Sequence, residues 1–461
     1  MSQSGLLPHQ EKELAFLRAN NRALLLSEMG CGKTPVMLTK AADILDAGGC
    51  VLWITTKSLG KQLVAEAERW IGVPPVAFDK ATAEDSFLWI THESVHRRAE
   101  ALTLRAPFDY LVVDEGSKLG GLGEKPSAPV ASGIRGVLQA ARGSVVATGT
   151  PVNSPHGLDL WALAEAAGLP VMNRHEYESG VKWKTLSTNR WQTKVPDGIR
   201  WQVFDRLARQ ITPSAIRHTL ADLEADLPDV DTQHHQVPLS QTAAQAYQQA
   251  DRISDTLRWH QETQAASRDT PLVEEALQIV RQHSTDSMLL FSDQFDLLDE
   301  LAHRITQSGV KFGRITGNET EKQRAAAQEA FAQQHLRLLL VTGAGEYGLN
   351  AQAASRLVTI AQTWSPAREA QRLGRIRRVG SPHEVVTHHI VSPAVALEER
   401  KQARLAKKQT LADLLWQLLH GNEPSCAHGP LQHHMGMGGD GKPFEALFCP
   451  QRMRNCEPIW L

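Results

Sequence analysis

The sequence predicts an α/β protein with two parallel sheets in tandem, joined by a helical segment and followed by a short tail. Short apolar runs of strand length alternate with segments of helical spacing over residues 1–165, and again over 286–395. Such alternation is typical of parallel sheets with helical crossovers. Residues 166–285 interrupt it and look mostly helical, and 396–461 form C-terminal helices and the tail. The 461 residues suffice for two or three domains of about 150 residues.

Composition and charge indicate an ordinary globular chain. It is 42% hydrophobic and 22% charged. No apolar run reaches the ~18 residues of a transmembrane helix, and the N-terminus lacks the basic and apolar regions of a signal peptide. We therefore expect no membrane association and a cytoplasmic location, which five cysteines also fit. A net charge of −2 argues against a generally basic surface but allows a local basic groove for nucleic acid.

The apolar run 23–26 leads into a glycine-containing loop and then into a segment of helical spacing, which together indicate a phosphate-binding loop. Gly30 and Gly32 let backbone N–H groups turn toward a phosphate, although Ser27 stands where the pattern usually begins with glycine. Lys33 is expected to reach the β- and γ-phosphates, and the Thr34 hydroxyl to bind Mg²⁺. The predicted nucleotide-binding residues of this loop are Glu28, Met29, Gly30, Cys31, Gly32, Lys33 and Thr34.

A glutamine precedes this loop by about twenty residues. Gln10 lies at the start of a helical pattern. Its amide can both donate and accept, so it can bind the edges of an adenine. Taken alone, a surface amide at a helix start is the better interpretation.

Two adjacent carboxylates follow the next strong strand signal, the apolar run 110–113. Adjacent acids at the end of a buried strand are costly unless a cation or a donor meets them. Asp114 is therefore expected to hold Mg²⁺ through water, and Glu115 to orient and deprotonate an attacking water. A capped strand end is the alternative. A further strand, 144–147, ends in the hydroxyl-rich stretch 148–150.

The order of these motifs resembles the first half of a superfamily-two helicase core. The stretches Ser-Glu-Met-Gly-Cys-Gly-Lys-Thr (27–34) and Ala-Thr-Gly-Thr-Pro-Val-Asn (147–153) are similar to the Swi/Snf branch of DNA translocases. The resemblance implies two RecA-like domains with ATP and Mg²⁺ between them, acting on double-stranded DNA. The compact chain resembles motors of bacteria and their viruses, which implies a bacterial or phage-infected cytoplasm.

The second half carries stretches that fit the same resemblance. The glycine-rich segment 342–350, with Gly348 near its end, resembles the motif that couples DNA to the nucleotide. Gln371, Arg375 and Arg378 lie at spacings of four and three, on one predicted helical face. The resemblance implies that Gln371 lies at the nucleotide, that Arg378 is an arginine finger and that Arg375 accompanies it at the γ-phosphate. A basic surface helix is the alternative.

Two features of the intervening segment stay open. By resemblance, Arg217 would lie in a bridge near the nucleotide. Four cations are interleaved with two tryptophans, a mixture that suits nucleic-acid binding by phosphate contact and stacking, but a solvated helical face fits equally well. These residues are Lys182, Trp183, Lys184, Arg190, Trp191 and Lys194.

The C-terminal tail contains three of the five cysteines. Cys426, His428, Cys449 and Cys456 form a set of the Cys₃His type that suits structural Zn²⁺, and a metal would stabilise a tail with little core. His433 or His434 are alternatives to His428. An unmetallated tail with free thiols is the other interpretation.

The resemblance thus implies an ATP-dependent translocase on double-stranded DNA. One alternative is a helicase that separates or anneals strands in replication, recombination or repair. Another is an ATP-gated DNA-binding scaffold with weak hydrolysis, against which Glu115 and Arg378 argue.

Overall fold

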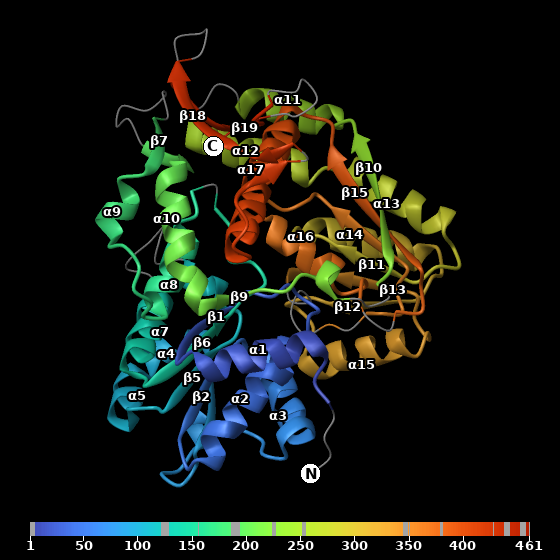
Figure 1. Ribbon diagram of the computed structural model, residues 1–461. Coiled ribbons are helices and arrows are strands. Elements are labelled where there is room, and N and C mark those ends of the chain that lie inside the picture. The colour runs from blue at the N-terminus through green and yellow to red at the C-terminus, as the bar shows by residue number, and fades with distance from the viewer. Residues whose placement is uncertain are drawn as a thin grey trace. The chain divides into compact units, whose positions relative to one another are not determined.

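The computed structural model describes residues 5–120, 129–154, 156–185, 194–223, 227–250, 255–343, 349, 351–378, 381–426, 428–437, 443–451 and 458–460. The chain forms two compact units. The first comprises Met1–Lys184, Val195–Leu223 and Lys407–Leu461, and the second comprises Thr185–Lys194 and Glu224–Ala406. Each unit has a parallel sheet of its own (Figure 1). The predicted fold class is thereby confirmed, whereas the division of the chain at 165, 285 and 395 stays a prediction.

The first unit is organised around a seven-stranded sheet in the order β3-β4-β2-β5-β6-β1-β9. Its strands are β1 (Arg22–Leu25), β2 (Val51–Thr55), β3 (Val76–Ala77), β4 (Phe87–Thr91), β5 (Tyr110–Val113), β6 (Gly143–Ala147) and β9 (Ala215–Ile216). All of the pairings are parallel. The carboxyl ends of β5, β6 and β1 are therefore neighbours at one edge, where parallel sheets bind their ligands.

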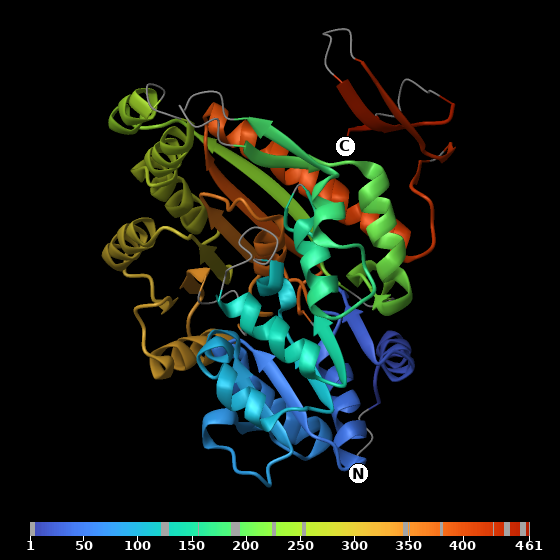
Figure 2. The ribbon, with the colours of Figure 1, turned by 90° about the vertical axis from the view of Figure 1, so that its left-hand side faces the viewer.

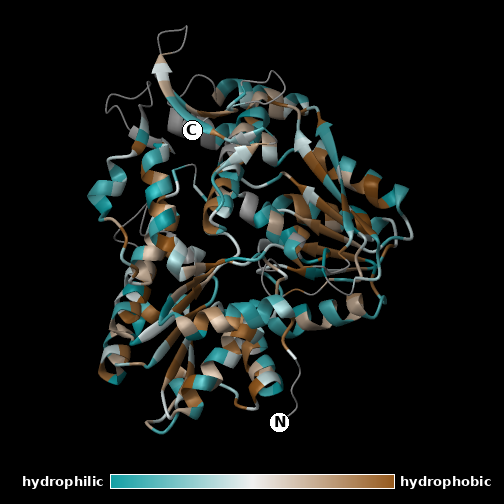
Figure 3. Ribbon diagram, viewed as in Figure 1, coloured by the Kyte–Doolittle hydropathy of each residue, from teal (hydrophilic) through white to brown (hydrophobic). Residues whose placement is uncertain are grey.

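Two hydrophobic cores cover the two faces of this sheet. Leu24 of β1 belongs to one core and Leu25 to the other, because successive side chains of a strand point to opposite faces. The strands are correspondingly brown in Figure 3. The helices of this unit are α1 (Pro8–Ala19), α2 (Lys33–Asp46), α3 (Lys57–Ile71), α4 (His92–Arg97), α5 (Ala99–Arg105), α7 (Pro129–Ala140), α8 (Leu158–Ala166), α9 (Arg174–Glu178) and α10 (Trp201–Ile211). Short 3-10 helices lie at Phe78–Lys80, Gly116–Gly120, Thr212–Ser214 and Leu220–Asp222.

The second unit contains a six-stranded parallel sheet in the order β10-β15-β14-β11-β13-β12. Its strands are β10 (Asp229–Val237), β11 (Met288–Phe291), β12 (Phe312–Ile315), β13 (Leu338–Val341), β14 (Arg356–Ile360) and β15 (Val385–Pro393). Its helices are α11 (Gln241–Ala250), α12 (Asp255–Ser267), α13 (Thr270–Gln282), α14 (Phe295–Gln307), α15 (Glu321–Ala332), α16 (Pro366–Leu373) and the first part of α17 (Ala396–Leu419).

Strand β10 was not expected, because it falls in the segment that looks mostly helical in sequence. It pairs with β15 along its whole length, from Asp229 opposite Val385 to Val237 opposite Pro393. As an edge strand with mostly exposed side chains, it carries His, Gln and Asp and gives no apolar signal.

The C-terminal part of the chain belongs to the first unit. Leu411, Leu414, Leu415 and Leu418 of α17 are buried in the same core as Leu24. Beyond the helix lie a two-stranded hairpin and a three-stranded antiparallel sheet, drawn in red in Figure 2. These strands are β16 (Ser425–Cys426), β17 (Gly429–Pro430), β18 (Gln432–Met437), β19 (Pro443–Phe448) and β20 (Ile459–Trp460). A separate pair is β7 (Val181–Thr185) with β8 (Lys194–Ile199).

Candidate active site

The loop after β1 has the backbone conformation that a phosphate-binding loop requires. Gly30 and Gly32 have φ values of 91° and 73°, which disfavour a side chain. Gly32 is also the N-cap of α2, so the N-terminus of this helix opens at the loop. The Lys33 ammonium donates to the carbonyl oxygens of Ser27, at 2.7 Å, and Glu28, at 3.0 Å. The Lys33 side chain thus lies over the phosphate-binding loop and contacts its backbone carbonyls.

Helix α1 holds this loop from one side. Gln10 is 5% exposed, and its Nε2 donates to the Gly32 carbonyl at 3.0 Å while its Oε1 accepts from the Leu7 N–H at 2.8 Å. A Cβ on Gly32 would lie 2.4 Å from Gln10 Nε2, so the close approach requires glycine. His9 Nε2 lies 2.8 Å from the Cys31 carbonyl. Gln10 is therefore a buried loop contact rather than a surface amide, and an adenine contact stays a prediction.

The acid pair lies at the end of β5, as predicted. The Asp114 N–H donates to the Ile54 carbonyl at 2.9 Å, and Asp114 Oδ1 accepts from the Glu115 N–H at 3.0 Å. Burial and the Glu115 carboxylate raise the pKa of Asp114 to about 7, against the opposing effect of Lys33. Glu115 has φ of 57°, a conformation uncommon for residues other than glycine, and Gly116 behind it leaves no room for a Cβ. The backbone is therefore strained where the two carboxylates are presented.

The hydroxyl stretch after β6 packs against the phosphate loop. The Thr148 N–H donates to the Leu25 carbonyl at 3.0 Å, and the Thr150 N–H donates to Thr148 Oγ1 at 3.1 Å. A Cβ on Gly149 would lie 2.9 Å from Met29 Cγ. The three motifs, which are spread over residues 27–150, thus meet on neighbouring strands.

The residues present fit a magnesium ion. A hydroxyl from Thr34 and a carboxylate from Asp114 are oxygen donors of the kind that Mg²⁺ binds. The raised pKa of Asp114 also indicates a buried carboxylate that lacks a full positive partner. A cation at this place would meet that need.

The segment that follows β9 covers the same loop. The Leu220 N–H donates to Glu28 Oε2 at 3.0 Å, and a Leu220 methyl lies 3.2 Å from where a Gly30 Cβ would be. Arg217, with 9% of its side chain exposed, lies 3.5 Å from Glu28 Oε1 and 4.7 Å above the Trp416 ring. Burial lowers the pKa of Arg217. Arg217 therefore contacts the phosphate loop, which fits its predicted place.

In the second unit, the predicted arginines lie beyond the helix that was expected to carry them. Helix α16 ends at Leu373, and Gly374 begins a series of turns, so Gln371, Arg375 and Arg378 do not share one regular helix. Gln371 and Arg375 are 3% and 4% exposed. Arg375 Nη1 lies 3.4 Å from the Leu349 carbonyl, beside the glycine-rich segment. Arg378 Nε donates to the Gly374 carbonyl at 2.8 Å.

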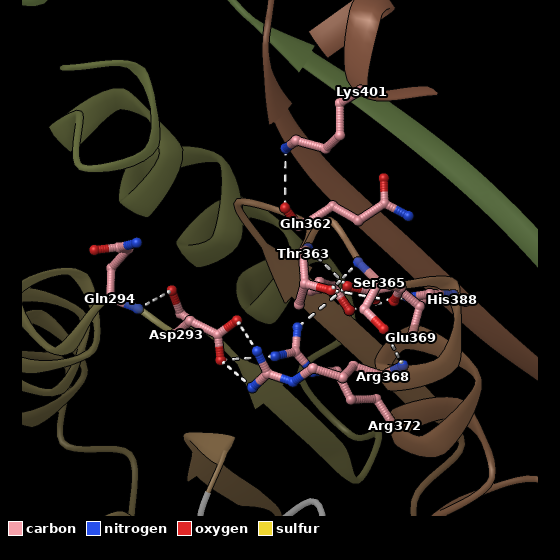
Figure 4. A network of polar contacts seen from close by, with 12 residues as sticks. Asp293, Gln294, Gln362, Thr363, Ser365, Arg368, Glu369, Arg372, His388 and Lys401 are labelled. Atoms are coloured by element: carbon pink, nitrogen blue, oxygen red, sulfur yellow. Dashed lines mark hydrogen bonds and ion pairs between the residues drawn. The ribbon is translucent and has the colours of Figure 1, made fainter. Parts of the chain in front are cut away.

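A polar network holds helix α16 to the sheet of the second unit (Figure 4). Arg372, which lies among the predicted site residues, is fully buried. Its Nη2 lies 2.9 Å from Asp293 Oδ1, and its guanidinium lies 5.2 Å from the Phe291 ring centre. Arg368 makes two further bonds to Asp293, at 2.7 and 3.0 Å. Asp293 is 79 residues away in sequence, so no local pattern indicated this partner.

Three of the predicted zinc ligands meet in the C-terminal tail. His428 Nδ1 lies 3.8 Å from Cys426 Sγ and 3.5 Å from Cys449 Sγ, and all three ligand atoms lie within 4.8 Å of one another. His433 instead lies 2.8 Å from Glu445, which makes His428 the better candidate. Zinc–ligand distances of about 2.0–2.3 Å in a tetrahedron separate ligand atoms by about 3.5–3.8 Å. The distances from His428 Nδ1 to the two sulfur atoms therefore suit a zinc site.

Several predicted residues lie outside the described residues. They are Gly348, Cys456, Arg190 and Trp191. Of the other predicted cations, Lys182 forms an ion pair with the buried Glu445 at 2.9 Å, while Trp183 next to it is 51% exposed. Lys182 is thus ion-paired within the first unit, which leaves one cation fewer for nucleic-acid binding by this segment.

The first unit thus brings a glycine loop of phosphate-binding conformation and an acid pair together at the carboxyl ends of neighbouring strands in one parallel sheet. The chain belongs to the SNF2-related family, whose domain matches residues 9–288. The helicase conserved C-terminal domain matches residues 271–380. The resemblance of the motifs to the Swi/Snf branch is thereby confirmed. No helix among the described ranges is both long enough and apolar enough to cross a membrane.

Similar proteins come from plants, bacteria and archaea. The probable ATP-dependent DNA helicase CHR12 of Arabidopsis thaliana is 24% identical over 450 residues, covering 84% of this chain and 40% of CHR12. Zorya protein ZorD of Escherichia coli is 25% identical over 386 residues, covering 71% of this chain and 33% of ZorD. The chain thus spans less than half the length of either relative. The Sulfolobus solfataricus SWI2/SNF2 ATPase core, solved in complex with dsDNA, is 18% identical with a TM-score of 0.43, covering 90% of this chain and 95% of that one.

Proposed function

We propose that this protein hydrolyses ATP to move along double-stranded DNA. The observation that carries the proposal is the meeting of Lys33, the acid pair at Asp114 and the hydroxyls at Thr148 on neighbouring strands of one sheet. The chain also matches both domains of its family, which supports a second unit that takes part in the reaction. A cytoplasmic location belongs to the proposal, and the four described cysteines, all free, suit a reducing compartment.

Each residue has a defined task in the proposed reaction. Lys33 exchanges its two carbonyl contacts for the β- and γ-phosphates, so ATP binding changes the loop itself. Thr34 and Asp114 hold Mg²⁺, which neutralises phosphate charge when bound. Glu115 orients the attacking water and takes its proton. Gln371, Arg375 and Arg378 act on the same nucleotide from the second unit, and alternation between nucleotide states moves the protein along DNA.

The deciding experiment measures ATP turnover with and without duplex DNA. We expect duplex DNA to stimulate the protein, and Glu115→Gln to lower kcat by about 100-fold or more because the general base is lost. Binding of a fluorescent ATP analogue should stay within twofold, since Glu115 acts after binding. Glu100→Gln, the same change at an exposed position of α5, should behave like the unmodified protein. An ATP turnover rate that is the same with and without duplex DNA would rule out the translocase.

The two alternatives differ in outcome rather than in their ATP site. A strand-displacement assay on forked DNA separates a helicase from a translocase, because a translocase hydrolyses ATP without releasing a strand. A triplex-displacement assay on intact duplex reports translocation directly. A scaffold would bind DNA in an ATP-dependent manner with the same weak turnover in Glu115→Gln and in the unmodified protein.

We also propose that Cys426, His428 and Cys449 hold a structural Zn²⁺, with the fourth position taken by Cys456 or by water. The distances among the three described ligand atoms support this site. Elemental analysis of the purified full chain should find about one zinc, and Cys449→Ser should lose it. Cys50→Ser, a change at a half-buried thiol elsewhere in the same unit, should keep it. Protein purified without any bound metal would remove this part of the proposal.

A further inference from the structure

A buried polar cluster lies directly behind the phosphate-binding loop. It joins three elements of the first unit: helix α1 through Glu13, the loop through Ser27, and the segment after β9 through His218. Glu13 and Ser27 are fully buried. Glu13 Oε1 accepts from Ser27 Oγ and lies 2.9 Å from His218 Nδ1. Ser27 belongs to the motif stretch 27–34, whereas Glu13 and His218 lie outside the motifs quoted for the family.

Ser27 is the hub of the cluster. Its hydroxyl donates to Glu13 and accepts from the His218 N–H at 2.9 Å, and its carbonyl accepts from the Lys33 ammonium at 2.7 Å. One residue therefore joins the buried carboxylate to the lysine of the phosphate loop. A glycine at this position, which is usual for the loop pattern, would offer no hydroxyl for either contact.

The next residue repeats the connection through the main chain. The Glu28 N–H donates to the His218 carbonyl at 2.8 Å, while the Glu28 carbonyl is the second acceptor of Lys33. Both carbonyls that hold Lys33 thus belong to residues fastened to His218. The position of the lysine is tied to segment 216–222.

The energetics argue that Glu13 is not there for packing. A fully buried carboxylate is costly, and its second oxygen, Oε2, has no hydrogen-bond partner among the described residues. An apolar side chain of similar size would remove that cost. The retained charge serves the two donors on Oε1, since hydrogen bonds to a charged acceptor are the stronger and more directional kind.

We propose that Glu13 is a positioning residue of the ATP site, which acts through Ser27 and His218 to fix the phosphate loop for nucleotide binding. When Lys33 turns from the Ser27 and Glu28 carbonyls to the phosphates of ATP, the change passes through the cluster to segment 216–222. The cluster thereby reports nucleotide occupancy to that segment. This inference rests on the proposed ATP hydrolysis and goes beyond it by assigning a role to Glu13 and His218, which lie outside the family motifs.

The test compares nucleotide affinity with turnover. Glu13→Gln keeps the size of the side chain and removes its charge. We expect it to raise the KM for ATP and the Kd of a fluorescent ATP analogue about tenfold, the effect of losing one charge-assisted hydrogen bond. The kcat at saturating ATP should change less than about threefold, because no reacting atom is touched. Glu11→Gln, at an exposed position of the same helix, should leave both constants unchanged.

A second variant keeps the inference testable if Glu13→Gln folds poorly. Ser27→Ala removes one oxygen atom and should raise the KM by a similar factor. Because both changes break the same link, Glu13→Gln with Ser27→Ala should raise the KM no further than either alone. Multiplying effects, or a KM within twofold of the unmodified value in Ser27→Ala, would overturn the inference.

Lys33→Ala separates a failure of this inference from a failure of the proposed function. If Lys33→Ala binds the ATP analogue as well as the unmodified protein does, the proposed ATP site itself is wrong. If Lys33→Ala loses binding while Ser27→Ala and Glu13→Gln retain it, only the role of the cluster is refuted.

Discussion

The contact between Asp293 and Arg372 gives a stability prediction whose size follows from the structure. Arg372 is fully buried in the second unit and lies 2.9 Å from Asp293 Oδ1. Asp293→Ala removes this carboxylate and leaves a buried guanidinium behind. It also removes the acceptor of both Arg368 contacts shown in Figure 4.

Breaking a buried ion pair by removing one partner typically costs about 3–5 kcal/mol. Glu369 lies 3.3 Å from Arg372 Nη1 and continues to offset part of the charge. We therefore expect the lower end of the range, about 3 kcal/mol in the free energy of unfolding. For a domain of about 150–250 residues, this corresponds to a fall in Tm of about 6–12 °C.

Urea unfolding and thermal melting of the full chain measure this loss. Asp299→Ala removes a carboxylate that is 54% exposed and paired with Arg314, and it should cost less than about 1 kcal/mol. Asp293→Ala combined with Arg372→Met removes the charge together with its partner, and it should recover most of the lost stability. The reasoning is refuted if Asp293→Ala stays within 0.5 kcal/mol of the unmodified protein (about the error of the method), or if the second change deepens the loss.

Three further predictions concern the arginine finger, the pH dependence and the acid-pair turn. Arg378→Lys should lower kcat by about 100-fold or more with little change in ATP-analogue binding, because lysine cannot make bidentate phosphate contacts. Burial lowers the pKa of His388 and of His389 to about 4. Below pH 6.5 the unfolded chain therefore binds protons at these histidines that the folded chain does not bind. Stability in urea unfolding should fall from pH 6.5 toward pH 4, by on the order of 2 kcal/mol per histidine at pH 5. Gly116→Ala places a Cβ 2.4 Å from a neighbouring side chain and should cost about 1–3 kcal/mol, whereas Gly136→Ala meets nothing within 4 Å and should be neutral or stabilising in the same melts.

The sequence predicted the parts of the site that are encoded locally. The phosphate loop is a contiguous stretch of sequence, and its glycines indicate a tight backbone turn. Asp114 directly follows an apolar run of strand length, which indicates a buried strand. The meeting of these motifs also followed, because the carboxyl ends of neighbouring parallel strands share one edge.

The features that the sequence did not predict depend on partners far away in the chain. An arginine is usually exposed, and the burial of Arg372 is explained by its ion pair with Asp293, which is far away in the sequence. Helix α16 ends at Leu373, before Arg375, and a spacing rule that assumes a continuous helix misses this end. Glu13 was not singled out in the sequence, because its partners Ser27 and His218 lie 14 and 205 residues away.

The composition of the first unit has a consequence for how the protein is made. Leu411, Leu414 and Leu415 complete a core that begins with Leu24, so this core needs chain from both ends of the sequence. A ribosome must synthesise the whole second unit before these leucines emerge. Contacts of such long range form slowly, and apolar surface that waits for them is prone to aggregation and proteolysis. The second unit, by contrast, has almost all of its chain in one stretch and is free to fold first.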